Sequence, residues 1–193
     1  SGLFIFYVSG RHFPEIPGSD VSRPFYELSG KTMAVIGLGT IGSRVAAVAQ
    51  AFGMKVVYYS TSGTSHSKDY PSLPLDEVMR TADVVSIHAP YNKHTAGLIG
   101  ERELKLMKPT AFIVNMGRGG IIDEAALASA IDNDLIGGAA LDVFVREPLP
   151  ADHPLLHTRH PEKLLFSPHI AWASVEARRR LAASIARNIK ETF

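Results

Sequence analysis

The sequence predicts an α/β fold built on a doubly wound parallel sheet. From Lys31 onward, short apolar runs of strand length alternate with segments of helical periodicity. A glycine turn joins the first strand to the first helix, and polar side chains follow the ends of the later strands. Strands that alternate with helices at this spacing form parallel β-α-β units, which bind ligands beyond the carboxyl ends of their strands.

The first β-α unit lies in the stretch KTMAVIGLGTIGSRVAA, which begins at Lys31. Its strand, 33–36, ends in a G-x-G-x-x-G turn formed by Gly37, Gly39 and Gly42. Gly37 permits a tight exit from the strand, Gly39 lets the backbone approach a pyrophosphate, and Gly42 lets the helix pack closely on the strand. The free N–H groups and the dipole of the helix N-terminus favour a phosphate anion. The helix has an apolar repeat at Ile41, Val45, Val48 and Phe52. With these flanks the turn indicates a Rossmann-type dinucleotide site rather than a purely structural turn.

The remaining elements follow from the same alternation. We expect further strands at 55–59, 83–87, 111–114, 136–143 and 163–166, and helices over 76–81, 101–107, from Asp123 and from near Ser174. Asp123 suits the N-cap of its helix. That helix has Leu127 and Ile131 four positions apart. Candidate core residues on the helices are Met107, Leu181, Ile185 and Ile189.

The pattern divides the chain into three parts. Residues 1–30 contain three prolines and no long periodic run, which indicates a connecting segment or the remnant of a second domain. Within them the apolar stretch Leu3 to Val8 is expected to be a buried segment or hinge. Residues 31–173 form the dinucleotide-binding domain, and residues 174–193 form a C-terminal helix.

Composition narrows the classes of partner. The chain has 20 Lys and Arg against 19 Asp and Glu, so no global field attracts nucleic acid or a membrane surface. No apolar stretch approaches the roughly 20 residues that span a bilayer. Cysteine is absent, which excludes thiol chemistry and is compatible with a reducing compartment. We therefore expect a cytoplasmic protein that binds neither nucleic acid nor membrane.

Four polar residues fall where the sheet would present them to a ligand. Arg118 follows the fourth strand, Asp142 ends the fifth, Glu147 comes shortly after it, and His169 follows the sixth. A guanidinium can hold a substrate carboxylate, and an imidazole can exchange a proton with a carbonyl oxygen. A neighbouring glutamate would stabilise the imidazolium during reduction. Each residue alone has a structural explanation, but together they fit hydride chemistry on a 2-oxo acid.

Five collinear stretches carry a more specific signal. They are ELSGKTMAVIGLGTIGSRVA, DVVSIHAPYNKHTAGLI, FIVNMGRGGIIDEAAL, GAALDVFVREPLPADHPL and SPHIAWASVEAR. From about Glu27 to Asn188 the chain resembles the cofactor-binding domain of the D-isomer-specific 2-hydroxyacid dehydrogenases. Trp172, in PHIAWAS, is similar to the glycerate dehydrogenase (hydroxypyruvate reductase) branch.

The resemblance implies a role for each matching residue. It makes Arg118 the binder of the substrate carboxylate, His169 the acid and base, and Glu147 its partner. It also implies NAD(P) as cofactor, with Asp142 near the nicotinamide carboxamide. A structural role, in which Asp142 accepts a hydrogen bond from the backbone, is an equal alternative. Thr40 and Ile41 would touch the pyrophosphate, and the rest of the cofactor would be lined by Ala89, Pro90, Thr95, Met116, Gly117 and Ala171.

The end of the second strand departs from the family pattern. Family members that prefer NAD carry an acidic residue there, whereas this chain has Ser60 followed by Thr61. Losing the acid removes repulsion against a 2′-phosphate, and hydroxyl groups can donate to it. The nearby cations are His66 and Lys68, and no arginine is present in this loop. We expect dual or NADP-leaning use.

The second departure is a missing part. The family has a separate substrate domain, built mostly from residues that precede this stretch and completed by the end of the chain. We expect the chain to be a fragment of a longer polypeptide. By itself, the fragment is expected to bind cofactor without efficient turnover. Because the family commonly dimerises through this domain, a homodimer is also expected.

Other features have simpler interpretations. His153, His157 and His160 suggest a metal site, but Pro154 and Pro161 separate them and no cysteine completes a ligand set, so we expect none. His88 is expected to be structural. The run Arg178 to Arg180 points in several directions on a helix and predicts a solvated face or an intersubunit contact. The competing function is a non-catalytic, nucleotide-responsive binding protein or corepressor.

Overall fold

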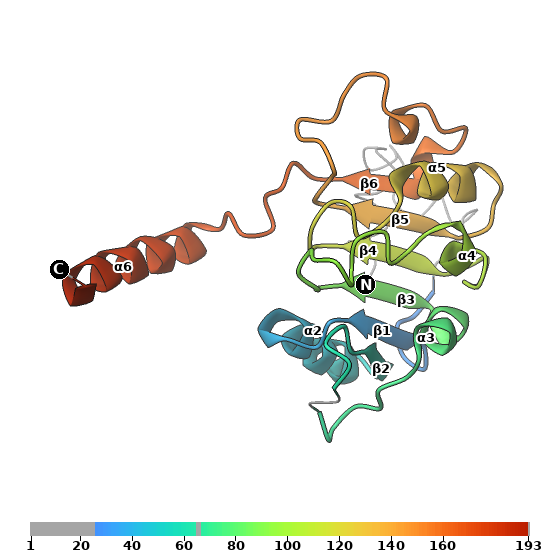
Figure 1. Ribbon diagram of the computed structural model, residues 1–193. Helices are drawn as coiled ribbons and strands as arrows, with labels where there is room; N and C mark the ends of the chain where they lie inside the picture. The colour runs from blue at the N-terminus through green and yellow to red at the C-terminus, as the bar shows by residue number, and fades with distance from the viewer. Residues whose placement is uncertain (1–25, 65–66, 193) are drawn as a thin grey trace, which may run out of the picture.

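The computed structural model describes residues 26–64 and 67–192 of the chain. Within them, six strands form one parallel sheet in the order β2-β1-β3-β4-β5-β6 (Figure 1). The strands are β1 (Thr32–Ile36), β2 (Lys55–Tyr59), β3 (Val84–Ile87), β4 (Phe112–Asn115), β5 (Gly138–Leu141) and β6 (Leu164–Phe166). The predicted α/β class with a parallel sheet is confirmed. The expectations for residues 1–25, including Leu3 to Val8, lie outside the described residues.

Helices cover the two faces of the sheet unequally. Side chains alternate between the faces along β1: Val35 packs in one cluster with Ala46 and Ala49 of α2 (Thr40–Ala51), whereas Ala34 and Ile36 belong to the larger core on the other side. That larger core also holds buried residues of α3 (Leu75–Thr81), α4 (Glu101–Leu104) and α5 (Glu124–Asp132). Figure 1 shows α3, α4 and α5 on the side of the sheet opposite α2. The direction of each crossover decides this division, because right-handed connections to the left and to the right of β1 lie on opposite faces.

The buried face of α2 differs from the one that the apolar repeat suggested. The helix exists where it was expected, but its buried residues are Gly42, Ala46 and Ala49. Ile41, Val48 and Phe52 are 65%, 57% and 57% exposed. The reason is steric. The helix approaches β1 so closely at Gly42 that only small residues fit between them, and the large side chains turn outward.

Some helices and strands are shorter than the apolar runs that predicted them. The run 136–143 contributes only four residues to β5, although Ile136 and Val143 are buried. The helix expected over 101–107 ends as α4 at Leu104, and Met107 is buried just beyond it. Two short 3₁₀ turns, Pro154–Leu156 and Pro161–Lys163, precede β6.

The start of α5 confirms the predicted N-cap. One carboxylate oxygen of Asp123 accepts hydrogen bonds from the N–H groups of Ala125 and Ala126, each at 3.0 Å. These are two of the orphan donors that begin any helix. Leu127 and Ile131, which lie four apart on this helix, are fully buried.

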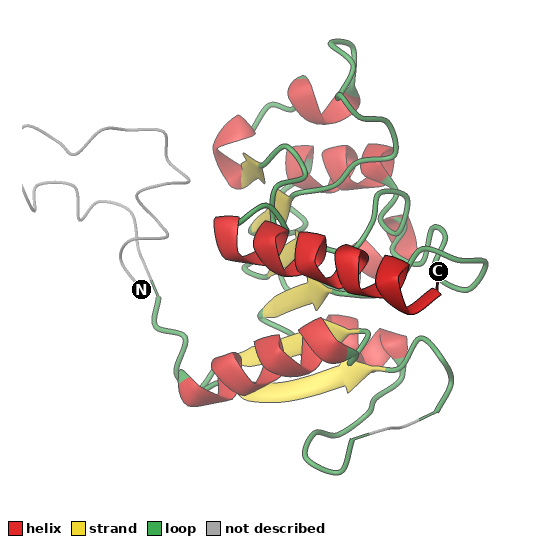
Figure 2. Ribbon diagram, turned by 90° about the vertical axis from the view of Figure 1, so that its left-hand side faces the viewer, coloured by secondary structure: helices red, strands yellow, loops and turns green. Residues whose placement is uncertain are grey.

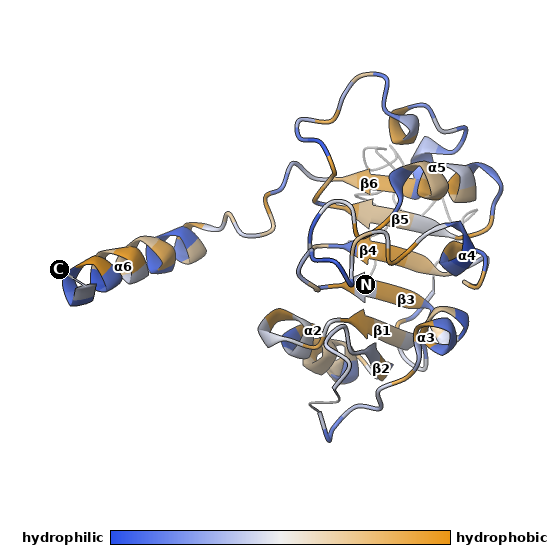
Figure 3. Cartoon of the chain, in the orientation of Figure 1, coloured by the Kyte–Doolittle hydropathy of each residue, from blue (hydrophilic) through white to orange (hydrophobic). Residues whose placement is uncertain are grey.

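The C-terminal helix α6 (Val175–Thr192) does not pack on the sheet. In Figure 1 it stands away from the domain, and the turned view of Figure 2 shows it in front of the sheet. Its apolar residues form a stripe visible in Figure 3, and Leu181, Ile185 and Ile189 are each more than half exposed. The expectation that these three belong to the core is wrong for the described residues. The periodicity correctly predicted an amphipathic helix, but not the surface that its apolar stripe contacts.

One row of paired residues runs along the carboxyl edge of the sheet. It consists of Tyr59, Ile36, Ile87, Asn115, Leu141 and Phe166, each aligned with its neighbour across the ladder. Because all six strands run the same way, the residues that follow this row lie along one edge. The loops that carry the predicted site residues all leave the sheet from this row.

The closeness of α2 to β1 generates a first prediction. A Cβ on Gly42 would lie 2.2 Å from the carbonyl oxygen of Gly37 and 3.0 Å from Val35 Cγ1. We expect Gly42→Ala to lower the free energy of unfolding by about 1–3 kcal/mol, because overpacking outweighs the gain in helix propensity. Urea denaturation measures the change.

Gly39→Ala is the matched control, because a Cβ at Gly39 meets no atom of the described residues within 4 Å. It should change the free energy of unfolding by less than about 1 kcal/mol. Equal stability of the Gly42→Ala variant and the unmodified chain would contradict the close packing described here.

Candidate active site

The glycine turn has the geometry that anion binding requires. Gly37 has a φ of +88°, in the left-handed region that favours glycine. A Cβ on Gly37 would lie 3.0 Å from the backbone of Ala89. Gly39 is the N-cap of α2 and has no side chain to satisfy the first N–H groups of that helix. The space beside Gly39 is open, as noted above. A helix N-terminus with uncapped donors and a free approach is suited to a phosphate group.

The other residues expected to line the cofactor lie around the same edge. Ala89 is buried against Gly37, Gly117 is buried, and Thr40, Pro90 and Ala171 are exposed. Met116 is 36% exposed. Thr95 is fully buried, and its hydroxyl donates to the carbonyl of Pro90 at 2.6 Å and accepts from the N–H of Asn92 at 2.9 Å. Its hydroxyl therefore holds the turn after β3 rather than facing outward.

Arg118 is held at the end of β4 by a buried amide. Asn115 Oδ1 accepts from the N–H of Gly117 at 3.0 Å, and Asn115 Nδ2 donates to the carbonyl of Arg118 at 2.9 Å. The guanidinium donates to the Gly117 carbonyl through Nη1 at 2.8 Å. The Arg118 side chain is exposed, and it forms no ion pair with any carboxylate of the described residues. It remains available to bind an anion.

His169 and Glu147 form a hydrogen-bonded pair. His169 Nδ1 lies 2.8 Å from Glu147 Oε2, and the other oxygen of Glu147 accepts from the N–H of Phe144 at 2.9 Å. The Phe144 N–H is the main cause that lowers the pKa of the Glu147 carboxyl, and the bond from His169 adds to it. Glu147 is therefore a carboxylate at neutral pH. His169 Nε2 has no hydrogen-bond partner among the described residues, so it can face a ligand.

Asp142 fixes the turn that carries His169. Its side chain is only 2% exposed and accepts three hydrogen bonds, from Ser167 Oγ at 2.5 Å and from the N–H groups of Ile170 and Ala171 at 2.9 Å. Burial alone would raise the pKa of Asp142, but these donors outweigh it and hold the pKa below its ordinary value. His169 adopts a left-handed φ of +54°, which is unusual for a residue other than glycine. Of the two interpretations left open for Asp142, the structure shows the hydrogen bonds to backbone.

Trp172 completes this turn. Its indole Nε1 donates to the carbonyl of His169 at 2.8 Å, although the ring itself is 54% exposed. The His169 backbone is therefore tied on one side to Trp172, while the two N–H groups that follow are tied to Asp142. Such contacts reduce the freedom of the imidazole relative to the sheet.

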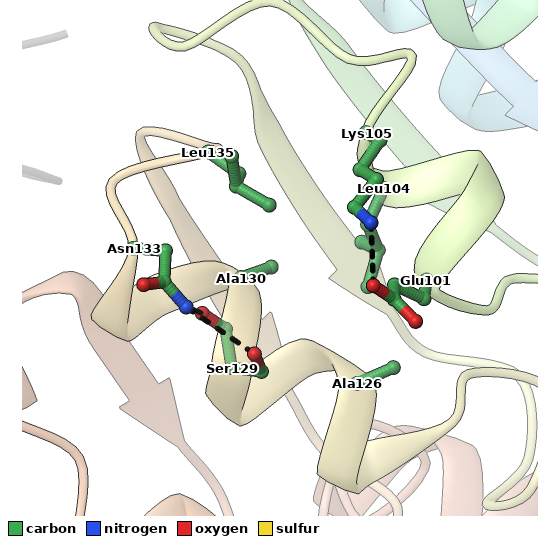
Figure 4. A pocket seen from close by; sticks show the side chains of 8 residues that line it. All are labelled: Glu101, Leu104, Lys105, Ala126, Ser129, Ala130, Asn133 and Leu135. Atoms are coloured by element: carbon green, nitrogen blue, oxygen red, sulfur yellow. Dashed lines mark hydrogen bonds and ion pairs between the residues drawn. The ribbon is translucent and has the colours of Figure 1, made fainter.

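The hollows on the described surface include two that differ in their lining. One of about 450 Å³ is lined by the His169–Glu147 pair and by the apolar side chains of Phe144, Leu149 and Phe166. The other, of about 270 Å³, lies between α4 and α5 (Figure 4). There the polar side chains bond one another, Lys105 to Glu101 and Asn133 to Ser129, and offer no convergent donors to a ligand. Of these two, the first adjoins the candidate catalytic residues Glu147 and His169.

The loop after β2 is built from hydroxyl groups. Ser60 Oγ donates to the carbonyl of Thr64 at 2.5 Å and lies 3.2 Å from Ser62 Oγ. Ser60 and Thr61 are both half-buried, and His66 lies outside the described residues. The loop is folded on itself beside the end of β2, where the family pattern predicts the ribose contact.

The described histidines do not form a metal site. His153 pairs with Glu124 at 2.9 Å, and His160 pairs with Glu162 at 3.2 Å. No group of three potential ligands is close enough to hold a metal ion within residues 26–64 and 67–192.

In the same ranges, no helix has the length and apolar character needed to cross a membrane. His88 Nε2 lies 2.8 Å from Ser86 Oγ, and burial lowers the pKa of its imidazole.

Comparison with known proteins identifies the domain. The family model for the D-isomer specific 2-hydroxyacid dehydrogenase, NAD binding domain, matches residues 12–171. The chain belongs to this family. The predicted membership of this family is therefore confirmed, and with it the Rossmann-type dinucleotide-binding fold.

Individual relatives agree with the family match. A glyoxylate reductase from Aeropyrum pernix is 45% identical over 168 residues, which cover 84% of this chain and 49% of the relative. A D-lactate dehydrogenase from Aquifex aeolicus, solved with NAD and lactic acid, has a TM-score of 0.81 and 31% identity, covering 90% of this chain and 56% of that one. An acyclic imino acid reductase, solved with NADPH and D-Arg, has a TM-score of 0.83 and 33% identity, covering 92% and 55%. The chain thus spans about half the length of the relatives that it matches.

Sequence reasoning missed the residues that hold the site loops in place. Three residues each bond a loop that carries a predicted site residue, although no sequence pattern predicted their roles. They are Asn115, Ser167 and Glu124. A signal existed for Asn115, because an amide at the end of an apolar strand, directly before a glycine turn, can both donate and accept. For Glu124 and Ser167 the partners are distant in sequence, so only the folded chain reveals them.

The Asp142 bonds generate a second prediction. Because the pKa of Asp142 is lowered in the folded state, its stabilisation is fully present above the ordinary carboxyl pKa of about 3.9 and is lost as the pH falls through the lower folded value. Asp142→Asn keeps the shape but turns an amide donor toward backbone donors. We expect it to lower the free energy of unfolding by about 2 kcal/mol or more at pH 7.

Urea denaturation from pH 7 to pH 3 tests this expectation. The difference between the unmodified chain and Asp142→Asn should shrink as the pH falls below about 4. Asp152→Asn, at an exposed position, is the control and should have little effect at any pH. A difference for Asp142→Asn that stays constant across this range would contradict the role of the carboxylate charge.

Proposed function

We propose that this domain serves an NAD(P)-dependent oxidoreductase that interconverts a D-2-hydroxy acid and its 2-oxo acid. The observation that carries the proposal is the His169–Glu147 pair, which lies beside the same sheet edge as the glycine turn and as Arg118, a guanidinium that no carboxylate of the described residues pairs with. The names of the relatives support the same reaction class.

The residues present fit a dinucleotide. The open approach to Gly39 and the free N–H groups of α2 suit its pyrophosphate, with Thr40 and Ile41 beside it. Ala89, Pro90, Met116 and Gly117 would line its path along the edge. When bound, the cofactor supplies the hydride that reduces the substrate carbonyl.

The chain's own residues would handle charge and protons. Arg118, which has no acidic partner among the described residues, would bind the substrate carboxylate through its planar guanidinium. His169 would give a proton from Nε2 to the carbonyl oxygen during reduction and take it back during oxidation. Glu147, bonded to Nδ1 and kept ionised by the Phe144 N–H, would orient the ring and stabilise its charged form.

A non-catalytic nucleotide sensor is the competing function. A sensor needs the nucleotide turn, but it does not need a histidine paired with a carboxylate while its second ring nitrogen stays free. Because the chain has this pair, the catalytic proposal accounts for more of the structure than the sensor does.

Replacing the imidazole tests the catalytic proposal. In the full-length protein, we expect His169→Asn to lower kcat by about 10²- to 10⁴-fold, because proton transfer loses its donor, while NAD(P)H affinity stays within about twofold. Turnover is measured as loss of reduced-cofactor absorbance with a panel of 2-oxo acids. His157→Asn is a matched control. Unchanged turnover in His169→Asn would remove this residue from the mechanism.

We propose small 2-oxo acids of the glyoxylate and hydroxypyruvate class as substrates. The proposal is supported by the similarity to a glyoxylate reductase and by Trp172, which holds the carbonyl of His169 and resembles the glycerate dehydrogenase branch. In the same panel, reduction confined to larger 2-oxo acids would contradict this substrate class without affecting the role of His169.

We propose dual or NADP-leaning cofactor use. Ser60 stands where NAD-preferring relatives carry an acid, so no carboxylate at that position repels a 2′-phosphate. We expect kcat/KM with NADPH to equal or exceed that with NADH, and Ser60→Asp to shift the ratio toward NADH by about 10-fold or more. A large preference of the unmodified protein for NADH would contradict the proposal.

We also propose that the protein is a homodimer that buries the outward face of α2. Val48 and Phe52 are large apolar residues that remain more than half exposed on this helix, a cost that a second copy packed on the same face would remove. Light scattering should give twice the chain mass, and Val48→Glu with Phe52→Glu should give the monomer mass. A monomeric unmodified protein would contradict the dimer, and a dimeric double variant would contradict its placement on α2.

A further inference from the structure

Glu124 is a nearly buried carboxylate whose two oxygens are both engaged. It begins α5, and its side chain is 11% exposed. Oε1 accepts from the N–H of Val145 at 2.7 Å, and Oε2 lies 2.9 Å from His153 Nε2. A buried carboxylate needs such partners to offset its lost hydration. The side chain thus ties the start of α5 to the loop that follows β5.

His153 orients this carboxylate through its ring nitrogen Nε2. Its Nδ1 accepts from the N–H of Leu155 at 3.3 Å, so that nitrogen carries no proton. The proton is then on Nε2, which donates to Glu124. The histidine that resembled a metal ligand in the sequence is instead a fixed donor, 13% exposed, between a 3₁₀ turn and α5.

The segment that Glu124 holds also carries Glu147, the partner of His169, and it faces the loop of Arg118. The N–H of Phe144 binds Glu147, and the next N–H, of Val145, binds Glu124. On the other side lies Gly119, which follows Arg118. A Cβ on Gly119 would fall 2.0 Å from the Phe144 carbonyl oxygen. The backbone at 144–145 is therefore fixed between the loop of Arg118 and the carboxylate partner of His169.

We infer that Glu124, oriented by His153, is a positioning residue that sets the spacing between Arg118 and the Glu147–His169 pair. The inference rests on the proposed function. Without the bond from Val145 to Glu124, the backbone at 144–145 keeps only one of its two bonds to carboxylates, the one from Phe144 to Glu147, and the imidazole shifts relative to the guanidinium. A displacement on the order of 1 Å in a catalytic constellation costs up to about 10²-fold in rate.

Glu124→Gln in the full-length protein tests this inference. Glutamine has the same shape, but it cannot accept both from Val145 and from His153 Nε2 without turning its amide donor toward one of them. We expect kcat to fall about 10-fold or more and the KM for the 2-oxo acid to rise, while the Kd for NAD(P)H stays within about twofold. Glu101→Gln, at an exposed ion pair on α4, is the control and should leave all three unchanged.

A purely structural role gives a different result. Destabilisation lowers the folded fraction, so turnover and cofactor-binding sites fall together and kcat per bound site stays constant. A reduced kcat per cofactor-binding site therefore supports positioning, and an unchanged value overturns it. Should Glu124→Gln fail to fold, His153→Asn replaces it, because it keeps the bond from Val145 to Glu124 and removes only the orienting donor. It should lower kcat per site by a smaller factor, and an unchanged value again overturns the inference.

The nitrogen resonances of the His169 ring give a readout independent of activity. In ¹⁵N-histidine-labelled protein, Glu124→Gln should shift the His169 ring signals, whereas Glu101→Gln should not. If no 2-oxo acid is reduced by the unmodified protein, the proposed function fails, and this spectrum still decides whether Glu124 positions His169. Unchanged His169 signals in Glu124→Gln would overturn the inference.

Discussion

The common register of six parallel strands is the constraint on which the rest of the structure depends. Tyr59, Ile36, Ile87, Asn115, Leu141 and Phe166 align across the sheet, and the chain leaves the sheet from this row at every strand. Residues separated by more than 130 positions, such as Gly37 and His169, are brought to one edge by this alignment alone. A parallel sheet therefore brings functional residues from the whole chain to one edge without requiring long loops.

Buried polar groups then hold the loops that leave this edge. Asn115 fixes the turn before Arg118, Asp142 fixes the turn of His169, and Glu124 fixes the peptide beside Glu147. Each accepts hydrogen bonds from backbone N–H groups that would otherwise be unsatisfied in a partly buried loop. For Asp142 these bonds keep a buried carboxyl ionised against the cost of burial. The site is thus held in place where its backbone leaves the sheet, while within residues 26–64 and 67–192 Arg118 pairs with no carboxylate and His169 Nε2 has no hydrogen-bond partner.

The sequence predicted the fold class and the position of Arg118, Asp142 and His169 just beyond the ends of successive strands, because period-2 and period-3.6 patterns and glycine spacing are local properties. It did not predict which face of α2 is buried, because that depends on how closely the helix approaches β1 at Gly42, where an added Cβ would fall 2.2 Å from the Gly37 carbonyl oxygen. The surface contacted by the apolar stripe of α6 is likewise not encoded in the periodicity of that helix. The supporting contacts of Glu124 and Ser167 escaped prediction because they join residues 21 to 29 positions apart, through loops without regular periodicity.

The most direct test of the central claim is a crystal structure of the protein with NAD(P)H and oxamate, a carboxylate mimic of a 2-oxo acid. The account predicts the pyrophosphate at the N–H groups that begin α2, the oxamate carboxylate on Arg118, and its carbonyl oxygen within about 2.7–3.2 Å of His169 Nε2. A cofactor bound away from the turn of Gly37, Gly39 and Gly42, or an oxamate that contacts neither Arg118 nor His169, would contradict it.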